Sequence, residues 1–99
     1  MGEGEDMPVY VLFAYDITDD RRRERAAKIL EGYGFRVQKS LFECFLEEDL
    51  IREAIGRLME VIDPEEDDLR VYRLCGACWG RREGFGRAVL TDEPKKIII

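Results

Sequence analysis

The sequence predicts an α+β domain with the ferredoxin-like βαββαβ order, in which two helices pack against one sheet. Short apolar runs typical of strands alternate along the chain with two longer segments whose apolar residues recur at helical spacing. The chain has 99 residues, which suits one domain but leaves a large share of its surface exposed. We therefore expect a single domain that gains stability by associating with a second copy.

The first strand and helix follow from local patterns. Val9–Tyr15 is a short apolar run rich in β-forming residues, which indicates a buried strand. A helix is predicted over 20–33, where apolar residues recur at helical spacing, with Thr18 or Asp19 as its N-cap. The two glycines that flank Tyr33 are expected to end it.

The middle of the chain predicts more strand, a second helix and a further strand. Residues 35–46 alternate in polarity, which indicates either one long strand bent near Ser40 or two paired strands. Residues 47–62 carry an apolar stripe of helical period. The acidic stretch 63–68 is expected to be a solvated turn, and 69–74 the next strand.

The chain ends are expected to lie outside the core. Residues 1–7 are predicted to be a disordered extension, with Met7 as a possible native start, and 8–92 the ferredoxin-like domain. A short strand is possible at 87–90. The apolar tail 93–99 suggests an extra strand that pairs with the partner subunit, or else a frayed end.

Composition narrows the function classes. The chain has no histidine, so it lacks both the usual general base near neutral pH and the commonest transition-metal ligand. Its three cysteines argue against a disulfide framework. No apolar run approaches the roughly 20 residues that span a membrane, and no signal peptide is evident. We expect a cytoplasmic protein whose hydrolytic chemistry, if any, relies on carboxylates, cysteine, lysine, tyrosine or a hard metal ion.

Charge is distributed unevenly along the chain. The net charge is −6, yet residues 21–40 hold seven basic and two acidic side chains. Residues 43–68 hold eleven acids and two arginines. A basic sector of this kind can attract phosphate even in an acidic protein, although a solvated helix face would give the same pattern.

Several stretches together resemble one family. "YDITDDRRRERAAKILEGYGFRVQKSLFECFL" combines a strand ending in Tyr-Asp-Ile, an acidic turn, an arginine-rich helix, a Gly-Tyr-Gly turn and the run Arg-Val-Gln-x-Ser-x-Phe-Glu-Cys. The later "LRVYRLC" fits the next strand. Over Val9 to Cys75 the chain resembles the CRISPR-associated protein 2 family, the small partner of the CRISPR adaptation integrase.

This resemblance implies a homodimer whose sheets face each other across the interface. It implies a metal-dependent endonuclease acting on RNA or DNA, or a non-catalytic bridge between integrase dimers during spacer acquisition. Asp16 matches the family's metal-site aspartate, one from each subunit. The positions that the family uses around that aspartate correspond to Tyr15, Arg23, Arg25, Arg36, Ser40 and Phe42.

The residue chemistry is compatible with these roles. Mg²⁺ often takes only one or two carboxylates and completes its shell with water and substrate phosphate, so Asp16 from two subunits would suffice. Arginines bind phosphate bidentately. Structural roles for the same residues stay open: Asp16 as a cap or Asx turn, Tyr15 or Phe42 as core aromatics, and Ser40 as a hydrogen-bonding strand residue.

A rival motif is Cys75-Gly-Ala-Cys78, in a stretch that otherwise reads as a loop. A C-x-x-C pair can be redox-active or can form half of a zinc site, for which Cys44 is the one further thiol. The alternative of another class is therefore a ferredoxin-like ligand-binding or redox module.

Overall fold

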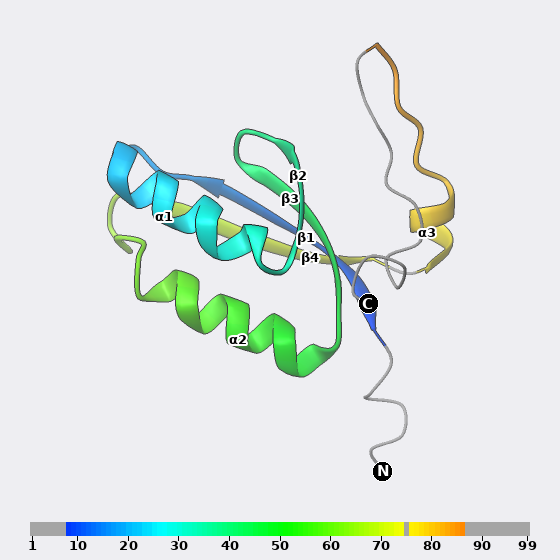
Figure 1. Ribbon diagram of the computed structural model, residues 1–99, viewed down its shortest axis with the longest axis horizontal. Coiled ribbons are helices and arrows are strands. Elements are labelled where there is room, and N and C mark those ends of the chain that lie inside the picture. The colour runs from blue at the N-terminus through cyan, green and yellow to red at the C-terminus, as the bar shows by residue number, and fades with distance from the viewer. Residues whose placement is uncertain (1–7, 75, 87–99) are drawn as a thin grey trace.

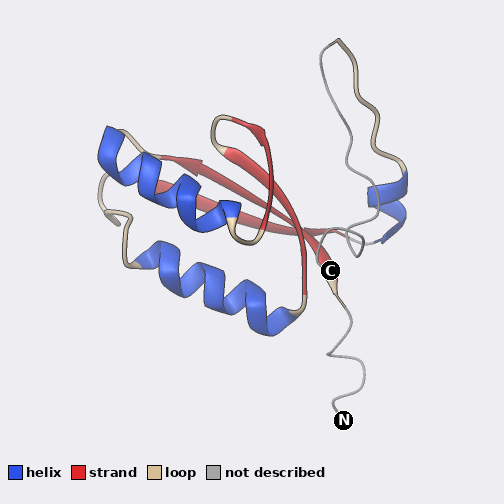
Figure 2. Cartoon of the chain, in the orientation of Figure 1, coloured by secondary structure: helices blue, strands red, loops and turns tan. Residues whose placement is uncertain are grey.

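The computed structural model describes residues 8–74 and 76–86 and confirms an α+β fold (Figure 1). Four antiparallel strands form one sheet in the order β2-β3-β1-β4, against which two long helices pack (Figure 2). The elements in chain order are β1 (Val9–Asp16), α1 (Asp20–Glu31), β2 (Gly34–Gln38), β3 (Leu41–Leu46), α2 (Glu48–Met59), β4 (Asp68–Leu74) and α3 (Gly76–Gly80).

The central strand β1 divides the sheet into two faces, because successive side chains of a strand point to opposite sides. The register pairs Val11 with Cys44 and Phe13 with Phe42 on one face, and Leu12 with Glu43 on the other. We call the helix-covered side the inner face; on β1 and β3 it consists of Val11, Phe13, Tyr15, Phe42, Cys44 and Leu46. The outer face consists of Tyr10, Leu12, Ala14, Asp16, Leu41, Glu43, Phe45, Asp68, Arg70, Tyr72 and Leu74.

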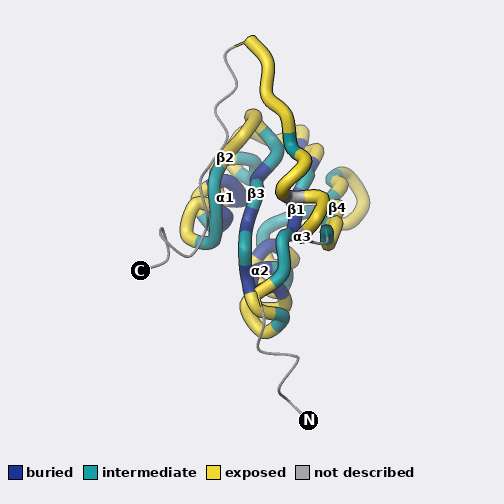
Figure 3. Tube along the Cα trace, turned by 90° about the vertical axis from the view of Figure 1, so that its right-hand side faces the viewer, coloured by how far each residue is buried: buried dark blue, intermediate teal, exposed yellow. Residues whose placement is uncertain are grey.

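The inner face and the helices build one core. α1 contributes Ala26, Ala27 and Leu30, and α2 contributes Ile51, Ala54 and Leu58, which are all buried. The buried parts of β1 and β3 stand out in Figure 3. The predicted helical stripes therefore face the sheet, but Leu50 and Met59 of the predicted α2 stripe remain exposed.

The start of α1 agrees with prediction and its end does not. Asp19 is the N-cap, and its carboxylate accepts a hydrogen bond from the backbone N–H of Arg22 at 3.0 Å. The helix ends at Glu31 rather than at residue 33, and its C-cap Gly32 keeps a right-handed conformation. α2 is also shorter than the predicted 47–62, because the chain leaves the helix after Met59.

Residues 35–46 form a hairpin, the second of the two predicted alternatives. β2 and β3 are antiparallel, with a turn at residues 39–40 and a register shift between Arg36 and Gln38. Gly34 opens β2 instead of ending a helix. A β-carbon on Gly34 would collide with the carbonyl oxygen of Glu43 and the sulfur of Cys44, so the close approach of the two strands requires glycine.

Two further expectations need correction. The stretch after β4, predicted as a loop, contains the short helix α3. The acidic stretch 63–68 is not a wholly solvated turn, because the Asp67 side chain has no exposed surface. The predicted extension 1–7, strand at 87–90 and tail 93–99 lie outside the described residues. Within the described part of the chain, no helix is long and apolar enough to cross a membrane.

Candidate functional site

Asp16 is the last residue of β1 and is exposed on the outer face. Its carboxylate does not cap α1, since Asp19 does so. Among residues 8–74 and 76–86 no side chain forms an ion pair or a hydrogen bond with Asp16. The structure therefore offers no capping or turn-forming explanation for this carboxylate.

A second carboxylate lies beside it. Asp16 is the register partner of Asp68, the first residue of β4. Like charges opposite each other on antiparallel strands repel, and Arg70 offsets this in part with a hydrogen bond of 2.8 Å to Asp68. No cluster of three or more potential metal ligands occurs in the described residues.

The inner face beside Asp16 carries a network around the β2–β3 turn. The Tyr15 hydroxyl donates to the carbonyl oxygen of Lys39 at 3.0 Å, and Arg36 donates to the same oxygen at 2.8 and 3.2 Å. The Arg36 guanidinium carbon lies 5.7 Å from the centroid of the Phe42 ring. The Tyr15 backbone N–H donates to the carbonyl oxygen of Ser40 at 3.1 Å.

This network accounts for four of the predicted site residues. Tyr15 and Phe42 are buried in the core, which is the packed-aromatic alternative for both. Burial raises the pKa of Tyr15, so its hydroxyl stays protonated and donates at neutral pH. Because Tyr15 and Asp16 are consecutive strand residues, the network and the Asp16 carboxylate point to opposite faces of β1. In this structure the Phe42 ring is not accessible for stacking on a base.

The arginines at the start of α1 hold the loop that follows Asp16. Arg23 donates to the carbonyl oxygen of Ile17 at 2.9 Å and pairs with Asp20. Arg22 binds Asp67 through two hydrogen bonds, of 2.8 and 3.1 Å. Both guanidinium groups are thereby committed to contacts within the protomer.

Asp67 is a supporting residue that the sequence pattern does not single out. Its side chain has no exposed surface, and it also accepts a hydrogen bond from the backbone N–H of Asp63 at 2.8 Å. The hydrogen bonds from Arg22 hold the pKa of Asp67 below its usual value despite burial, and the backbone of Thr18 adds to this. The one visible signal is an acidic pair next to a strand start, but nothing local distinguishes Asp67 from its exposed neighbours.

Arg25 is not part of the Asp16 loop. It is exposed and lines a groove between α1 and α2, on the helix side of the molecule. The predicted set is therefore divided among four places. Asp16 lies on the outer face, and Arg25 lies on the helix layer. Arg23 holds the loop after β1, and the β2–β3 turn with the adjoining inner face holds Tyr15, Arg36, Ser40 and Phe42.

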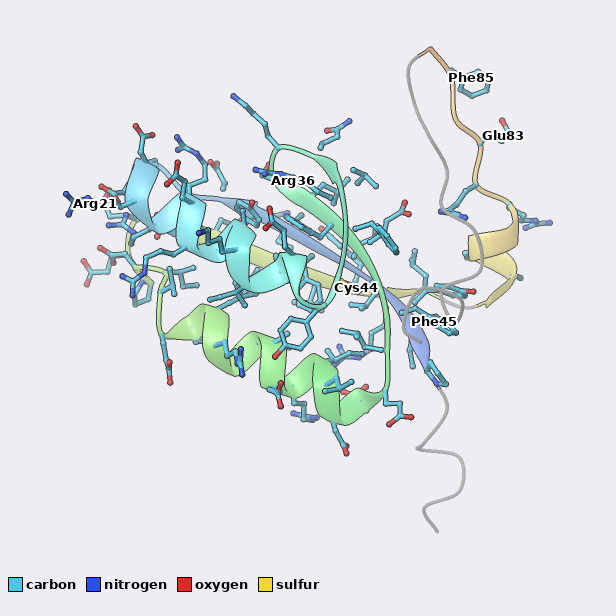
Figure 4. All side chains as sticks on the ribbon, viewed as in Figure 1. Arg21, Arg36, Cys44, Phe45, Glu83 and Phe85 are labelled. Carbon is cyan, nitrogen blue, oxygen red and sulfur yellow. The ribbon has the colours of Figure 1, made fainter. Side chains whose placement is uncertain are left out.

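The structure gives little support to the alternative zinc or redox site at the C-x-x-C motif. Cys78 is exposed, whereas Cys44 is buried in the inner face (labelled in Figure 4). Burial raises the pKa of Cys44 to about 12. A thiol in this state is a poor metal ligand and nucleophile, so Cys44 cannot serve as a third zinc ligand without unfolding of the core. Cys75 lies outside the described residues.

Comparisons with known proteins identify the family. The family described as "CRISPR associated protein Cas2" matches residues 7–82. A relative from Synechocystis sp., the "CRISPR-associated endoribonuclease Cas2 3", is 45% identical over 93 residues, which cover 94% of this chain and 100% of the relative.

Solved structures agree with this match. The protein TT1823 from Thermus thermophilus has a TM-score of 0.75 and 38% identity, over 84% of this chain and 96% of that one. A chain of the "Partial Cas6-RT-Cas1--Cas2 complex" has a TM-score of 0.66 and 29% identity, over 77% of this chain and 89% of that one. On the strength of the family match and the full-length relative, this chain belongs to the Cas2 family of CRISPR-associated proteins.

Proposed function

We propose that the protein is a homodimeric, Mg²⁺-dependent endonuclease of CRISPR adaptation, cutting RNA or DNA, with Asp16 from each subunit as the metal ligand. The observation that carries the proposal is the position of Asp16. Its carboxylate has no partner in the described residues, and it lies on the same face as the apolar side chains of β1 and β3. Relatives named as endoribonuclease or endonuclease support the reaction class.

The dimer would form through the outer face. The two long helices cover the opposite face, which leaves Leu12, Leu41 and Phe45 only half-buried. Tyr72 is 47% exposed and stands opposite Leu12 on the same face, and contiguous apolar surface of this kind is typical of an interaction site. α3 and the following Arg82, which pairs with Glu43 at 2.9 Å, border this surface. Pairing two such faces would bury the apolar residues and bring both copies of Asp16 to the interface.

The donor set suits Mg²⁺ better than a softer metal. Asp16 and its neighbour Asp68 supply carboxylate oxygens only, and these are the ligands that Mg²⁺ prefers. A bound Mg²⁺ would activate a water and offset charge on the scissile phosphate. Exposed basic side chains would hold the flanking phosphates. The part-buried Asp67–Arg22 pair would keep the Asp16 loop in position.

A second candidate function is a catalytically idle scaffold that bridges integrase subunits on double-stranded DNA. The absence of a three-ligand cluster among the described residues favours it, since catalysis then depends on how closely the two Asp16 residues approach. The similar chain in a complex named for Cas1 and Cas2 supports the integrase as partner in either case.

The substitution Asp16→Asn separates the two candidates. Labelled RNA and DNA would be incubated with wild-type protein, with Asp16→Asn and with Asp49→Asn, a matched loss of one exposed acid on α2, each with Mg²⁺ or with chelator. We expect cleavage only with Mg²⁺, and its loss in Asp16→Asn alone. Equal cleavage by Asp16→Asn would refute the assignment of the metal ligand. Absence of cleavage in all three, with DNA binding and integrase association intact, would favour the scaffold.

A further inference from the structure

The structure sorts the five cations of α1 into two groups. Arg22 and Arg23 are bound to Asp67, Asp20 and backbone oxygens. A second group shares exposure and the absence of any ion pair within residues 8–74 and 76–86; it consists of Arg21, Arg25 and Lys28. Within α1, only this second group has cations without an ion pair in the described residues, so these can meet an external anion.

The free group forms a stripe along α1. Its members stand at positions i, i+4 and i+7, so they lie on one side of the helix. At 1.5 Å of rise per residue the stripe is about 10 Å long. Arg21 points away from the start of α1 (Figure 4). The stripe thus follows about the first two turns of α1 on the solvent side.

α2 supplies a further cation to this stripe. A groove of about 420 Å³ between the helices is lined by Arg25, Lys28, Ile29, Arg57, Glu60 and Val61. The Arg57 guanidinium carbon lies 6.0 Å from the centroid of the Tyr33 ring, and Arg57 forms no ion pair within the described residues. Three cations and one acid therefore line this groove, although α2 belongs to the acidic part of the chain.

We propose that this groove, defined by Arg25, Lys28 and Arg57 and extended by Arg21, binds the phosphate backbone of a nucleic-acid strand. Charge complementarity identifies the ligand: the groove holds an excess of cations in a protein of net charge −6. A stripe about 10 Å long spans roughly three phosphates, spaced at about 3.4 Å of axis per strand. The groove lining contains no aromatic ring to stack on a base, so binding is independent of sequence.

The charges beside the groove determine the path of the bound strand across the surface. A larger depression adjoins the groove and shares Lys28, Ile29 and Arg57 with it. Its lining also contains four glutamates, namely Glu31, Glu43, Glu47 and Glu53. These acids repel phosphate, so the strand continues from the groove toward Arg21 and not toward Tyr33.

This site is separate from Asp16. The groove lies on the helix layer, whereas Asp16 lies on the outer face of the sheet. A dimer joined through its outer faces would carry one groove per protomer. The two grooves would lie on the two helix layers, at opposite sides of the dimer. The inference shares with the proposed function its nucleic-acid ligand, but it requires neither cleavage nor a metal ion.

The test compares two arginines of the same helix. Arg57→Gln removes a groove cation, and Arg52→Gln removes an exposed cation that pairs with Glu48. Binding of a fluorescent duplex of mixed sequence to the full-length protein is measured by anisotropy over a range of salt concentrations. We expect Arg57→Gln to weaken binding roughly threefold to tenfold near 0.1 M salt and to reduce the salt slope by about one. Arg52→Gln should bind as wild type.

Lys28 tests whether charge alone is required. Lys28→Gln should weaken binding as Arg57→Gln does, whereas Lys28→Arg should retain it, because a phosphate contact needs only the positive charge. Circular dichroism and thermal unfolding of each variant verify that the fold is intact.

The outcomes separate this inference from the proposed function. Equal binding by Arg57→Gln and Arg52→Gln would overturn the groove but leave the Asp16 assignment standing. Loss of integrase association in Arg57→Gln with unchanged duplex binding would show that the groove serves a protein, which also overturns it. Wild-type protein without salt-dependent duplex binding would overturn the groove and the scaffold on duplex DNA, whereas Mg²⁺-dependent RNA cleavage that requires Asp16 would still support the proposed endonuclease. Normal duplex binding by an Asp16→Asn variant that no longer cleaves would support the separation of the two sites.

Discussion

The two faces of the sheet are made from the same strands but have opposite characters. On β1 the inner-face residue Phe13 is fully buried, whereas its neighbour Leu12 on the outer face is only half-buried. The inner face is closed by α1 and α2, and the outer face combines apolar side chains with the carboxylates Asp16 and Asp68. One face therefore stabilises the protomer, while the other is suited to contact with a second copy.

The largest expected effect concerns the inner face. Phe13→Ala leaves a cavity in the core, because Phe13 is among the largest fully buried side chains. We expect the free energy of unfolding to fall by about 3–5 kcal/mol, measured by urea denaturation followed by circular dichroism. A loss below about 1 kcal/mol would mean that the inner face is less tightly packed than the structure indicates.

The matched change on the outer face should act on association. Leu12→Glu places a charge among the apolar residues of the proposed interface, while the inner face stays intact. We expect the dimer dissociation constant to rise roughly 30-fold or more, equivalent to about 2 kcal/mol, with little change in the far-ultraviolet spectrum. Sedimentation equilibrium measures this, and a wild-type protein that is monomeric at all concentrations would refute the dimer.

A smaller effect is expected for the Asp67–Arg22 pair, which supports the loop after β1. Asp67→Asn keeps the shape of the side chain but removes the charge bound by Arg22, so the melting temperature at pH 7 should fall by several degrees. The folded-state pKa of Asp67 is lowered, so its contribution is complete above about pH 4 and is lost as the pH falls below that value.

The pH dependence provides the control for this prediction. The stability difference between wild type and Asp67→Asn should be largest near neutral pH and should shrink toward pH 3. A difference that is independent of pH would mean that packing around Asp67, and not its charge, stabilises the loop.

The smallest expected effect concerns the reactivity of the cysteine side chains. In a Cys75→Ser background, an alkylating reagent at pH 8 should modify the exposed Cys78 readily and leave Cys44 unmodified, since burial raises the pKa of Cys44 to about 12. Mass spectrometry identifies the modified residue. Rapid labelling of Cys44 in the native protein would show that the inner face opens far more often than a closed core permits.

Much of the fold could be predicted from local pattern. The strand Val9–Asp16, the Asp19 cap and the helical stripe of α2 depend on residues within one or two turns of each other. The predicted limits of the helices were less accurate. Gly32 and Gly34 both indicate a break in the chain, but local pattern does not show which of them ends a helix and which begins a strand.

The sequence by itself determined the positions of β1, β4 and the two long helices, the basic segment and the family resemblance that singled out Asp16. Only the tertiary structure decided that Asp16 faces Asp68, that Asp67 is buried on Arg22, and that Arg25 and Lys28 join Arg57 in one groove. The reason is physical. Local pattern fixes which side of an element a residue occupies, but the charge that it meets there comes from strand register and helix packing between segments tens of residues apart.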